Sequence, residues 1–105
     1  MADLSLWLMP DTEWHHLLSR LIVRLSQQYA TPRFDPHLTL LGNIAMERGE
    51  AIDRTAQLAS RLRALEVVLK ELSYRGEFFR ALFLEAECTP ALMEAYRMAC
   101  AAFDR

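Results

Sequence analysis

The chain is poor in the features that mark secreted, membrane or nucleic-acid-binding proteins. It has two cysteines, Cys88 and Cys100, which are too few for the disulfide framework of a small secreted domain, so reduced thiols are expected. It has no run of lysine or arginine to follow a polynucleotide backbone, and its formal net charge is -2. No apolar stretch approaches the roughly 20 residues of a membrane span. These absences predict a cytoplasmic protein without a membrane or long nucleic-acid partner.

The composition of the chain and the absence of a linker indicate one ordinary globular domain. The opening letters MADLSLWLMPD hold an acidic residue and no basic region, so they do not resemble a signal peptide. No linker or low-complexity segment divides the chain. Of its 105 residues, 52% are hydrophobic and 25% are charged, which is enough to form a packed core. We therefore expect a single domain over residues 1–105.

Hydrophobic periodicity predicts seven elements in the order β-α-β-α-β-β-α. Pro10 ends the first strand, Gly42 the second, and Thr89-Pro90 is a strong helix start, with threonine as N-cap. The predicted fold class is α+β, with a mostly antiparallel sheet and helices on one face. The expected strands are 4–9, 37–42, 66–74 and 78–87, with a turn around Gly76. The first helix is expected to follow Asp11 or Thr12, the second to span 50–65 and the third to begin at Thr89.

Two of the helices show a clear apolar face. In the first, apolar residues recur at the three-and-four spacing of one face. In the second, the same spacing predicts an inward face and leaves arginines on the solvent side. The first face comprises Trp14, Leu17, Leu18, Leu21, Ile22 and Leu25, and the second comprises Ile52, Ala56, Ala59 and Leu62.

The second strand, FDPHLTLLGNI, contains the least ordinary residues of the chain. On a strand, residues i and i+2 share a face, so His37 and Thr39 point to one side and Leu38 and Leu40 to the other. An imidazole can move a proton near neutral pH, and a hydroxyl can donate to a phosphate oxygen. Taken alone, however, a lone strand histidine is more often a hydrogen-bonded structural residue.

The spacing of residues does not indicate a metal site, a catalytic cysteine or a phosphate-binding loop. His15 and His16 are adjacent on a predicted helix and point in different directions, so they cannot both join His37 at one ion. Neither cysteine has a histidine at a recognisable spacing, and there is no glycine-rich loop. We expect neither a metal nor another cofactor.

Three segments together resemble the 2H phosphoesterase superfamily, and its plant and fungal 2′,3′-cyclic nucleotide phosphodiesterases in particular. FDPHLTLLGNI resembles the histidine-x-threonine signature, in which His37 and Thr39 stand at the motif positions. SLWLMPD is similar to the opening strand of that branch. FFRALFLEAECTPALMEAYRMA resembles its middle strand and the helix that follows. The resemblance covers nearly the whole chain in the right order.

The resemblance implies a two-lobed enzyme with two such motifs facing each other across a cleft. One histidine would deprotonate the attacking water, the other would protonate the leaving ribose oxygen, and the hydroxyls would hold the phosphate. His37 is then one acid or base and Thr39 one phosphate donor, with no metal or cofactor. Aromatics of this branch often stack on a base, and Phe79 or Trp7 are candidates for that contact with substrate.

The sequence departs from the family in one respect, because no second His-x-Thr or His-x-Ser is present. His37 cannot act as acid and base at once. The chain is then a fragment or natural truncation, a homodimer in which each copy supplies one His37, or a relative that binds without turnover. Self-association is expected in each case, since half of a two-lobed fold leaves apolar sheet exposed.

Two functions from different classes follow. The first is a cyclic phosphodiesterase-like hydrolase, acting on small ligands with a 2′,3′-cyclic phosphate of nucleotide or ADP-ribose type, if a dimer partner supplies the second motif. The second is a non-catalytic dimeric ligand-binding or interaction module with the same half-fold. A purely structural role for His37 is a third possibility.

Overall fold

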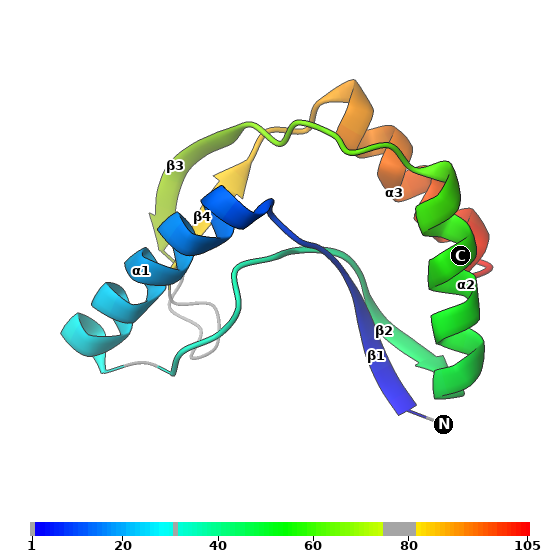
Figure 1. Cartoon of the computed structure of the whole chain (residues 1–105), viewed down its shortest axis with the longest axis horizontal. Coiled ribbons are helices and arrows are strands. Elements are labelled where there is room, and N and C mark those ends of the chain that lie inside the picture. Colours follow the sequence, from blue (N-terminus) through cyan, green and yellow to red (C-terminus); the bar gives the residue numbers. More distant parts are fainter. Residues whose placement is uncertain (1, 31, 75–81) are drawn as a thin grey trace. The chain divides into compact units, whose positions relative to one another are not determined.

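The computed structural model of the chain describes residues 2–30, 32–74 and 82–105. The element order in that part of the chain is the predicted β-α-β-α-β-β-α, and the α+β class is confirmed (Figure 1). The predicted turn around Gly76 and the candidate Phe79 lie outside the described residues. The elements are β1 (Ala2–Leu8), α1 (Thr12–Tyr29), β2 (Leu38–Met46), α2 (Arg48–Arg61), β3 (Leu69–Tyr74), β4 (Leu82–Ala86) and α3 (Pro90–Ala102).

The described strands pair two by two. β1 and β2 form one antiparallel sheet, and β3 and β4 form another, so the predicted antiparallel pairing is present in two separate two-stranded sheets. The chain divides into two compact units, Met1–Arg48 and Gly49–Arg105, and each is described by itself. The predicted placement of the helices on one face of a sheet stays a prediction.

The β1–β2 pair of the first unit is irregular, because β2 carries extra residues. Leu4 is opposite Ile44, Leu6 is opposite Leu41 and Trp7 is opposite Thr39. Two steps along β1 therefore match three along β2, and the next single step matches two. Each mismatch is a β-bulge, which leaves an extra residue in β2 and changes the direction of the neighbouring side chains. The adjacent Leu40 and Leu41 are both buried for this reason, with exposed fractions of 6% and 5%.

The prediction that Gly42 ends the second strand is wrong. β2 continues through Gly42 to Met46 and pairs with β1 as far as Ala2. The bulge makes this continuation possible, since Asn43 adopts a left-handed conformation with φ of 53°. Asparagine tolerates that region better than most residues do. A glycine near the middle of a strand here indicates a bulge instead of a strand end.

Helix α1 begins as predicted and buries little. Its N-cap is Asp11, whose carboxylate accepts a hydrogen bond from the Trp14 amide at 2.9 Å. Among its described side chains only Ser26 is buried, and the predicted apolar face is half-buried or exposed, with Trp14 51% and Leu17 48% exposed. Since amphipathic helices gain most of their stability from burying that face, α1 presents an apolar face that this unit does not bury.

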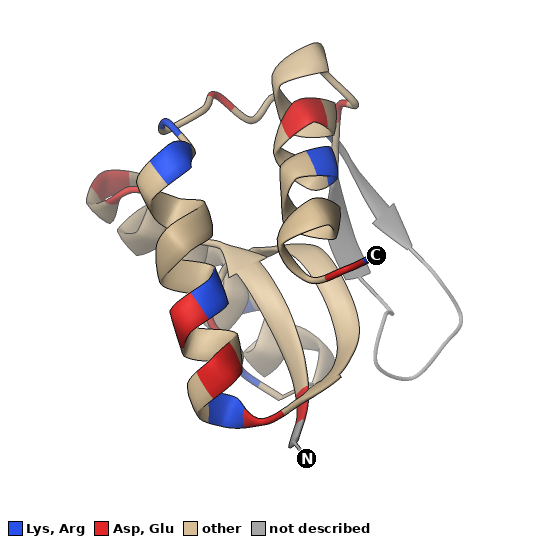
Figure 2. Cartoon of the chain, turned by 90° about the vertical axis from the view of Figure 1, so that its right-hand side faces the viewer, with Lys and Arg blue, Asp and Glu red and all other residues tan. Residues whose placement is uncertain are grey.

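In the second unit, hydrogen bonds from Arg54 link α2 to the C-terminal end of α3, and both helices are labelled in Figure 1. α2 buries Ala51 and Leu58, which stand one position before the predicted inward residues Ile52 and Ala59. The predicted inward face of this helix is therefore wrong, and Ile52 is 61% exposed. α3 buries Leu92, Ala95 and Ala99, and Thr89 is its N-cap with Pro90 in the first turn, as predicted. Figure 2 shows acidic and basic residues along these helices.

None of the described helices is both long enough and apolar enough to cross a membrane.

Candidate active site

His37 lies immediately before β2, in a backbone position that fixes its ring. Pro36 before it is buried and His37 itself is half-buried. The Nδ1 atom of His37 lies 2.6 Å from the carbonyl oxygen of Asp35. Because a carbonyl oxygen only accepts hydrogen bonds, Nδ1 must carry the proton. The Nε2 atom is then the nitrogen with a lone pair in the neutral ring, and it has no hydrogen-bond partner among the described residues.

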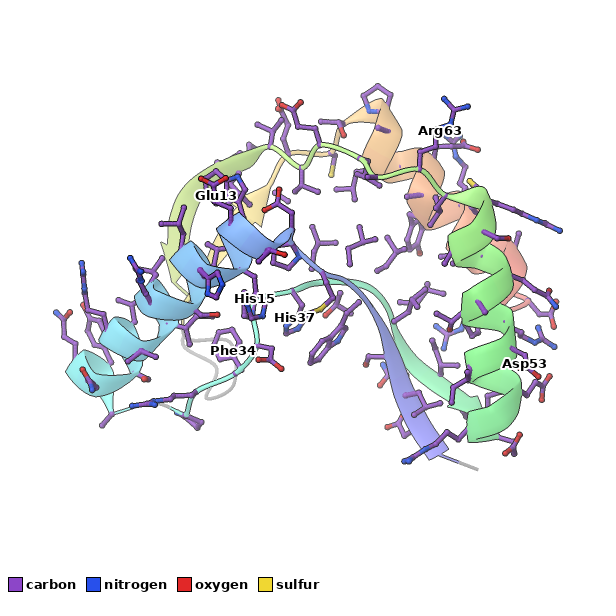
Figure 3. All side chains as sticks on the ribbon, in the orientation of Figure 1. Glu13, His15, Phe34, His37, Asp53 and Arg63 are labelled. Carbon is purple, nitrogen blue, oxygen red and sulfur yellow. The ribbon has the colours of Figure 1, made fainter. Side chains whose placement is uncertain are left out.

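Two aromatic rings contact the His37 imidazole. The indole of Trp7 is stacked on it, with ring centroids 3.5 Å apart and an interplanar angle of 13°. The ring of Phe34 meets it edge-on, at 6.3 Å and 84° (Figure 3). Trp7 and Phe34 are 43% and 57% exposed, so the cluster is at the surface. An imidazole held in this way is ordered and still open to solvent.

Thr39 is close to this cluster through the β1–β2 register. It lies directly opposite Trp7 in the ladder, and residues opposite each other in an antiparallel pair share a face. Thr39 is exposed, and within the described part of the chain its hydroxyl has no hydrogen-bond partner. The predicted common face of His37 and Thr39 thus agrees with the register, because both residues are neighbours of Trp7.

The arrangement can transfer one proton and donate one hydrogen bond to an anion. A bare Nε2 accepts a proton as a general base, and the protonated ring returns it as a general acid. The Thr39 hydroxyl can donate to a phosphate oxygen. One imidazole fills one of the two roles at a time, so these residues can supply one of the two proton-transfer groups that a hydrolysis by acid and base needs.

Other candidate residues do not join this cluster. His15 and His16 on α1 contact each other edge-on, with ring centroids 6.4 Å apart. A shallow surface depression on α1 is lined by Glu13, His16, Leu17 and Arg20, which belong to a single helix. In the described segments no three His, Cys, Asp or Glu side chains are close enough to hold a metal ion.

The sequence did not reveal two parts of the cluster. The Asp35 carbonyl and the Phe34 ring both belong to the loop before β2. The sequence signal for them is Phe-Asp-Pro, since proline restricts the backbone of the residue before it. Trp7 was expected to contact substrate, and the structure places one face of its indole on His37.

Comparison with known proteins agrees with this arrangement. The family model described as cyclic phosphodiesterase-like protein matches residues 1–105. The chain belongs to this family. The resemblance in the sequence to the plant and fungal branch of the 2H phosphoesterases is therefore confirmed.

Two relatives of this cyclic phosphodiesterase-like chain come from a plant and a yeast. A cyclic phosphodiesterase of Arabidopsis thaliana is 30% identical over 91 residues, which are 87% of this chain and 50% of the plant protein. A 2′,3′-cyclic-nucleotide 3′-phosphodiesterase of Yarrowia lipolytica (strain CLIB 122 / E 150) is 29% identical over 103 residues, covering 90% of this chain and 47% of the yeast protein. The chain thus spans about half the length of these two relatives.

Proposed function

We propose that this chain supplies half of the active site of a metal-independent phosphodiesterase that hydrolyses 2′,3′-cyclic phosphates of nucleotides or ADP-ribose-type sugars. The observation that carries the proposal is the geometry at His37. Its Nδ1 proton is donated to the Asp35 carbonyl, so that in the neutral ring Nε2 is the nitrogen with the free lone pair. The exposed Thr39 hydroxyl is on the strand two residues along, opposite the tryptophan that stacks on His37. The plant relative is named a cyclic phosphodiesterase and the yeast relative a 2′,3′-cyclic-nucleotide 3′-phosphodiesterase, and these names support the proposed substrate class.

In the proposed reaction a water oxygen attacks phosphorus and the bond from phosphorus to one ribose oxygen breaks. One imidazole accepts the water proton, and a second, protonated imidazole gives a proton to the leaving ribose oxygen. The product is a ribose phosphate monoester with one free hydroxyl. Thr39 would donate to a non-bridging phosphate oxygen, whose share of the charge grows during the attack. No metal or other cofactor takes part in these steps.

The second imidazole must come from outside these 105 residues, because no other His-x-Thr or His-x-Ser motif is present in them. We propose that a second copy of the chain supplies it, so that a two-fold axis places two His37 side chains on one phosphate. The interface of a two-fold dimer uses the same surface on both copies. The exposed Trp7, Met9 and Phe34 give this unit apolar surface of the kind that such interfaces bury.

The other expectations are part of the same proposal. Trp7 and Phe79 are proposed to contact the base of the substrate, Trp7 through the indole face that is not stacked on His37. The partners are a small phosphorylated ligand and a second copy, with no membrane or long nucleic acid. The proposed location is the cytoplasm.

A non-catalytic dimeric module, which binds a ligand or partner protein without turnover, is the second candidate. It is favoured by one specific observation, namely that the sequence holds one His-x-Thr motif where hydrolysis needs two imidazoles. Binding of a cyclic phosphate without its hydrolysis is the result expected for this module.

The test is hydrolysis of 2′,3′-cyclic nucleotides by the full chain, by His37→Ala and by His16→Ala. His16 is an exposed histidine of α1 outside the His-x-Thr motif, so its variant is the matched control. We expect loss of activity in His37→Ala and an unchanged rate in His16→Ala. Equal rates in wild type and His37→Ala would exclude the catalytic function.

The dimer is tested by mixing wild type with an equal amount of His37→Ala under conditions that let the copies exchange. If each site needs two His37 side chains, about a quarter of the sites stay active, whereas about a half stay active if each chain acts alone. A monomer in sedimentation at micromolar concentration would contradict the dimer. Dimers that bind a cyclic nucleotide without hydrolysing it would favour the non-catalytic module.

A further inference from the structure

We propose that Trp7 is a positioning residue for His37: its indole fixes the imidazole plane so that Asp35 keeps the proton on Nδ1 and Nε2 is the reactive nitrogen. The catalytic meaning of this inference depends on the proposed function. The conformational part, a single fixed tautomer, does not, and it can be tested without any substrate.

The contacts restrain the imidazole in complementary ways. The stack at 3.5 Å and 13° opposes tilting of the ring toward the indole. The hydrogen bond from Nδ1 to the Asp35 carbonyl, at 2.6 Å, opposes a flip of the ring that would put Cδ2 in the place of Nδ1. Phe34, edge-on at 84°, limits movement along the remaining side. Because the terminal torsion of a histidine is otherwise broad, these restraints select one orientation.

Trp7 connects the histidine and the threonine of the motif. It pairs with Thr39 through the strand ladder and with His37 through its ring. A shift of the indole would therefore alter the position of His37 relative to Thr39. Placement of the proton-transfer group and of the phosphate donor to within about 0.5 Å is what a working site needs.

Exposure separates this cluster from ordinary core packing. Trp7 is 43% exposed and Phe34 is 57% exposed, so the stack buries much less apolar area than a core cluster does. A stack of this kind contributes little to stability and much to the orientation of one ring. We therefore expect substitutions of Trp7 to change His37 more than they change the fold.

The first experiment is nitrogen-15 NMR of the histidine side chains of the full chain, which separates the two neutral tautomers. The His37 signals are assigned by their loss in His37→Gln. In the wild type we expect one tautomer with the proton on Nδ1. In Trp7→Leu we expect loss of that single-tautomer pattern in favour of the mixture that an unrestrained histidine adopts in water, while Trp7→Phe, which keeps a ring, retains most of it.

The matched control is Trp14→Leu. Trp14 is 51% exposed, which is close to the exposure of Trp7, and it lies on α1, where it stacks on no histidine of the described residues. Its replacement should leave the His37 tautomer unchanged. Circular dichroism of each variant checks that the secondary structure is retained. A fixed Nδ1–H tautomer that persists in folded Trp7→Leu would overturn the proposal.

A second readout uses the fluorescence of Trp7 alone, in a Trp14→Phe background. An imidazole in stacking contact with an indole quenches its emission, so the emission of Trp7 should rise when His37→Gln is added. An emission that is the same with and without His37→Gln would show that Trp7 does not report on His37 and would overturn the stack.

Kinetics then distinguish the two proposals. If hydrolysis is present, Trp7→Leu should lower kcat, and Trp7→Phe should restore most of it. If the chain hydrolyses nothing but the tautomer depends on Trp7, the positioning stands and the proposed function fails. If hydrolysis depends on His37 but neither kcat nor the tautomer responds to Trp7, the positioning fails and the function stands.

Discussion

Arg54 donates a hydrogen bond from Nη1 to a carboxylate oxygen of Asp104 at 2.9 Å, across 50 positions of the sequence. The same guanidinium donates to the Ala102 carbonyl at 3.1 Å and to Glu50 at 2.8 Å. It therefore joins α2 to the C-terminal end of α3, where helix carbonyls lack partners of their own. The hydrogen bond to Asp104, followed by that to Glu50, raises the pKa of Arg54 above its ordinary value.

Replacing Arg54 with lysine should lower the Tm measurably. Lysine keeps the charge but presents a single ammonium, which cannot reproduce the fork that reaches Ala102, Asp104 and Glu50 together. The control is Arg97→Lys, because Arg97 makes one exposed ion pair with Glu94 on the same helix. Thermal unfolding followed by circular dichroism is the measurement, and equal Tm values for both variants would contradict the bridging role.

Ala30→Gly should stabilise the chain. Ala30 caps the C-terminus of α1 in a left-handed conformation, with φ of 53°, and its amide donates to the Ser26 carbonyl. Glycine removes the Cβ clash of that conformation, so we expect a gain of about 0.5 to 1 kcal/mol in the free energy of unfolding.

The matched control is Ala59→Gly, at an exposed position inside α2. There the glycine should cost about 0.5 to 1 kcal/mol, because it loosens a helix interior. Urea unfolding gives both values, and a loss of stability in Ala30→Gly would show that the cap does not have the described conformation.

Tyr96 should titrate at higher pH than ordinary tyrosines. Its neighbour Cys100, first by hydrogen bonding and then by charge, raises the pKa of Tyr96. The folded state thus holds this proton more tightly than the unfolded state, so the associated stability is present below the ordinary tyrosine pKa and is lost as the pH rises through the folded pKa.

Cys100→Ala should lower the pKa of Tyr96 toward its ordinary value, whereas Cys88→Ala should leave it unchanged because Cys88 is an exposed thiol before α3. Ultraviolet difference titration measures tyrosinate formation, and Tyr96→Phe identifies the signal. A pKa that is the same in Cys100→Ala and wild type would contradict the contact.

Thr39→Val should reduce hydrolysis of 2′,3′-cyclic nucleotides by about 10²-fold in kcat, as expected when one donor to a developing oxyanion is removed. Valine keeps the β-branched shape, so the strand pair with Trp7 should be retained. Thr39→Ser keeps the hydroxyl and should stay within a few-fold of wild type. Steady-state kinetics on the active assembly make the comparison, and a wild-type kcat in Thr39→Val would remove the hydroxyl from the mechanism.

Local chemistry made part of the fold predictable. Thr89 and Pro90 are a cap and first-turn pair whose meaning depends only on neighbouring residues, and the structure has both in those roles. Asp11 was one of two candidate caps of α1 and is the one used. The order of all described elements follows from the same local patterns.

Other features depend on packing that periodicity does not encode. In α2 two residue sets one position apart both have helical spacing, and the structure buries the set with Ala51 and Leu58. Thr55, one turn after Ala51 in the same helix, donates a hydrogen bond from its hydroxyl to the Ala51 carbonyl at 2.7 Å. The β2 bulge could not be predicted either, because a glycine such as Gly42 is compatible both with the end of a strand and with a bulge inside one.

For the site, the sequence provided candidate residues but not their contacts. The motif and its resemblance made His37 and Thr39 the candidates, and the structure has Trp7 opposite Thr39 in the ladder and stacked on His37. The stacking of Trp7 on His37 depends on how two bulges align the strands, which no spacing rule predicts.

The position of His37, one residue before β2, makes its ring contacts sensitive to heat. The ladder ends at the pair of Leu8 and Leu38, and His37 is the next residue. The terminal pairs of a two-stranded ribbon open first, at a free-energy cost well below that of global unfolding. Opening there separates Trp7 from His37 while the helices stay intact. Loss of the Trp7–His37 stack should therefore begin at temperatures where the helical signal is still that of the native chain.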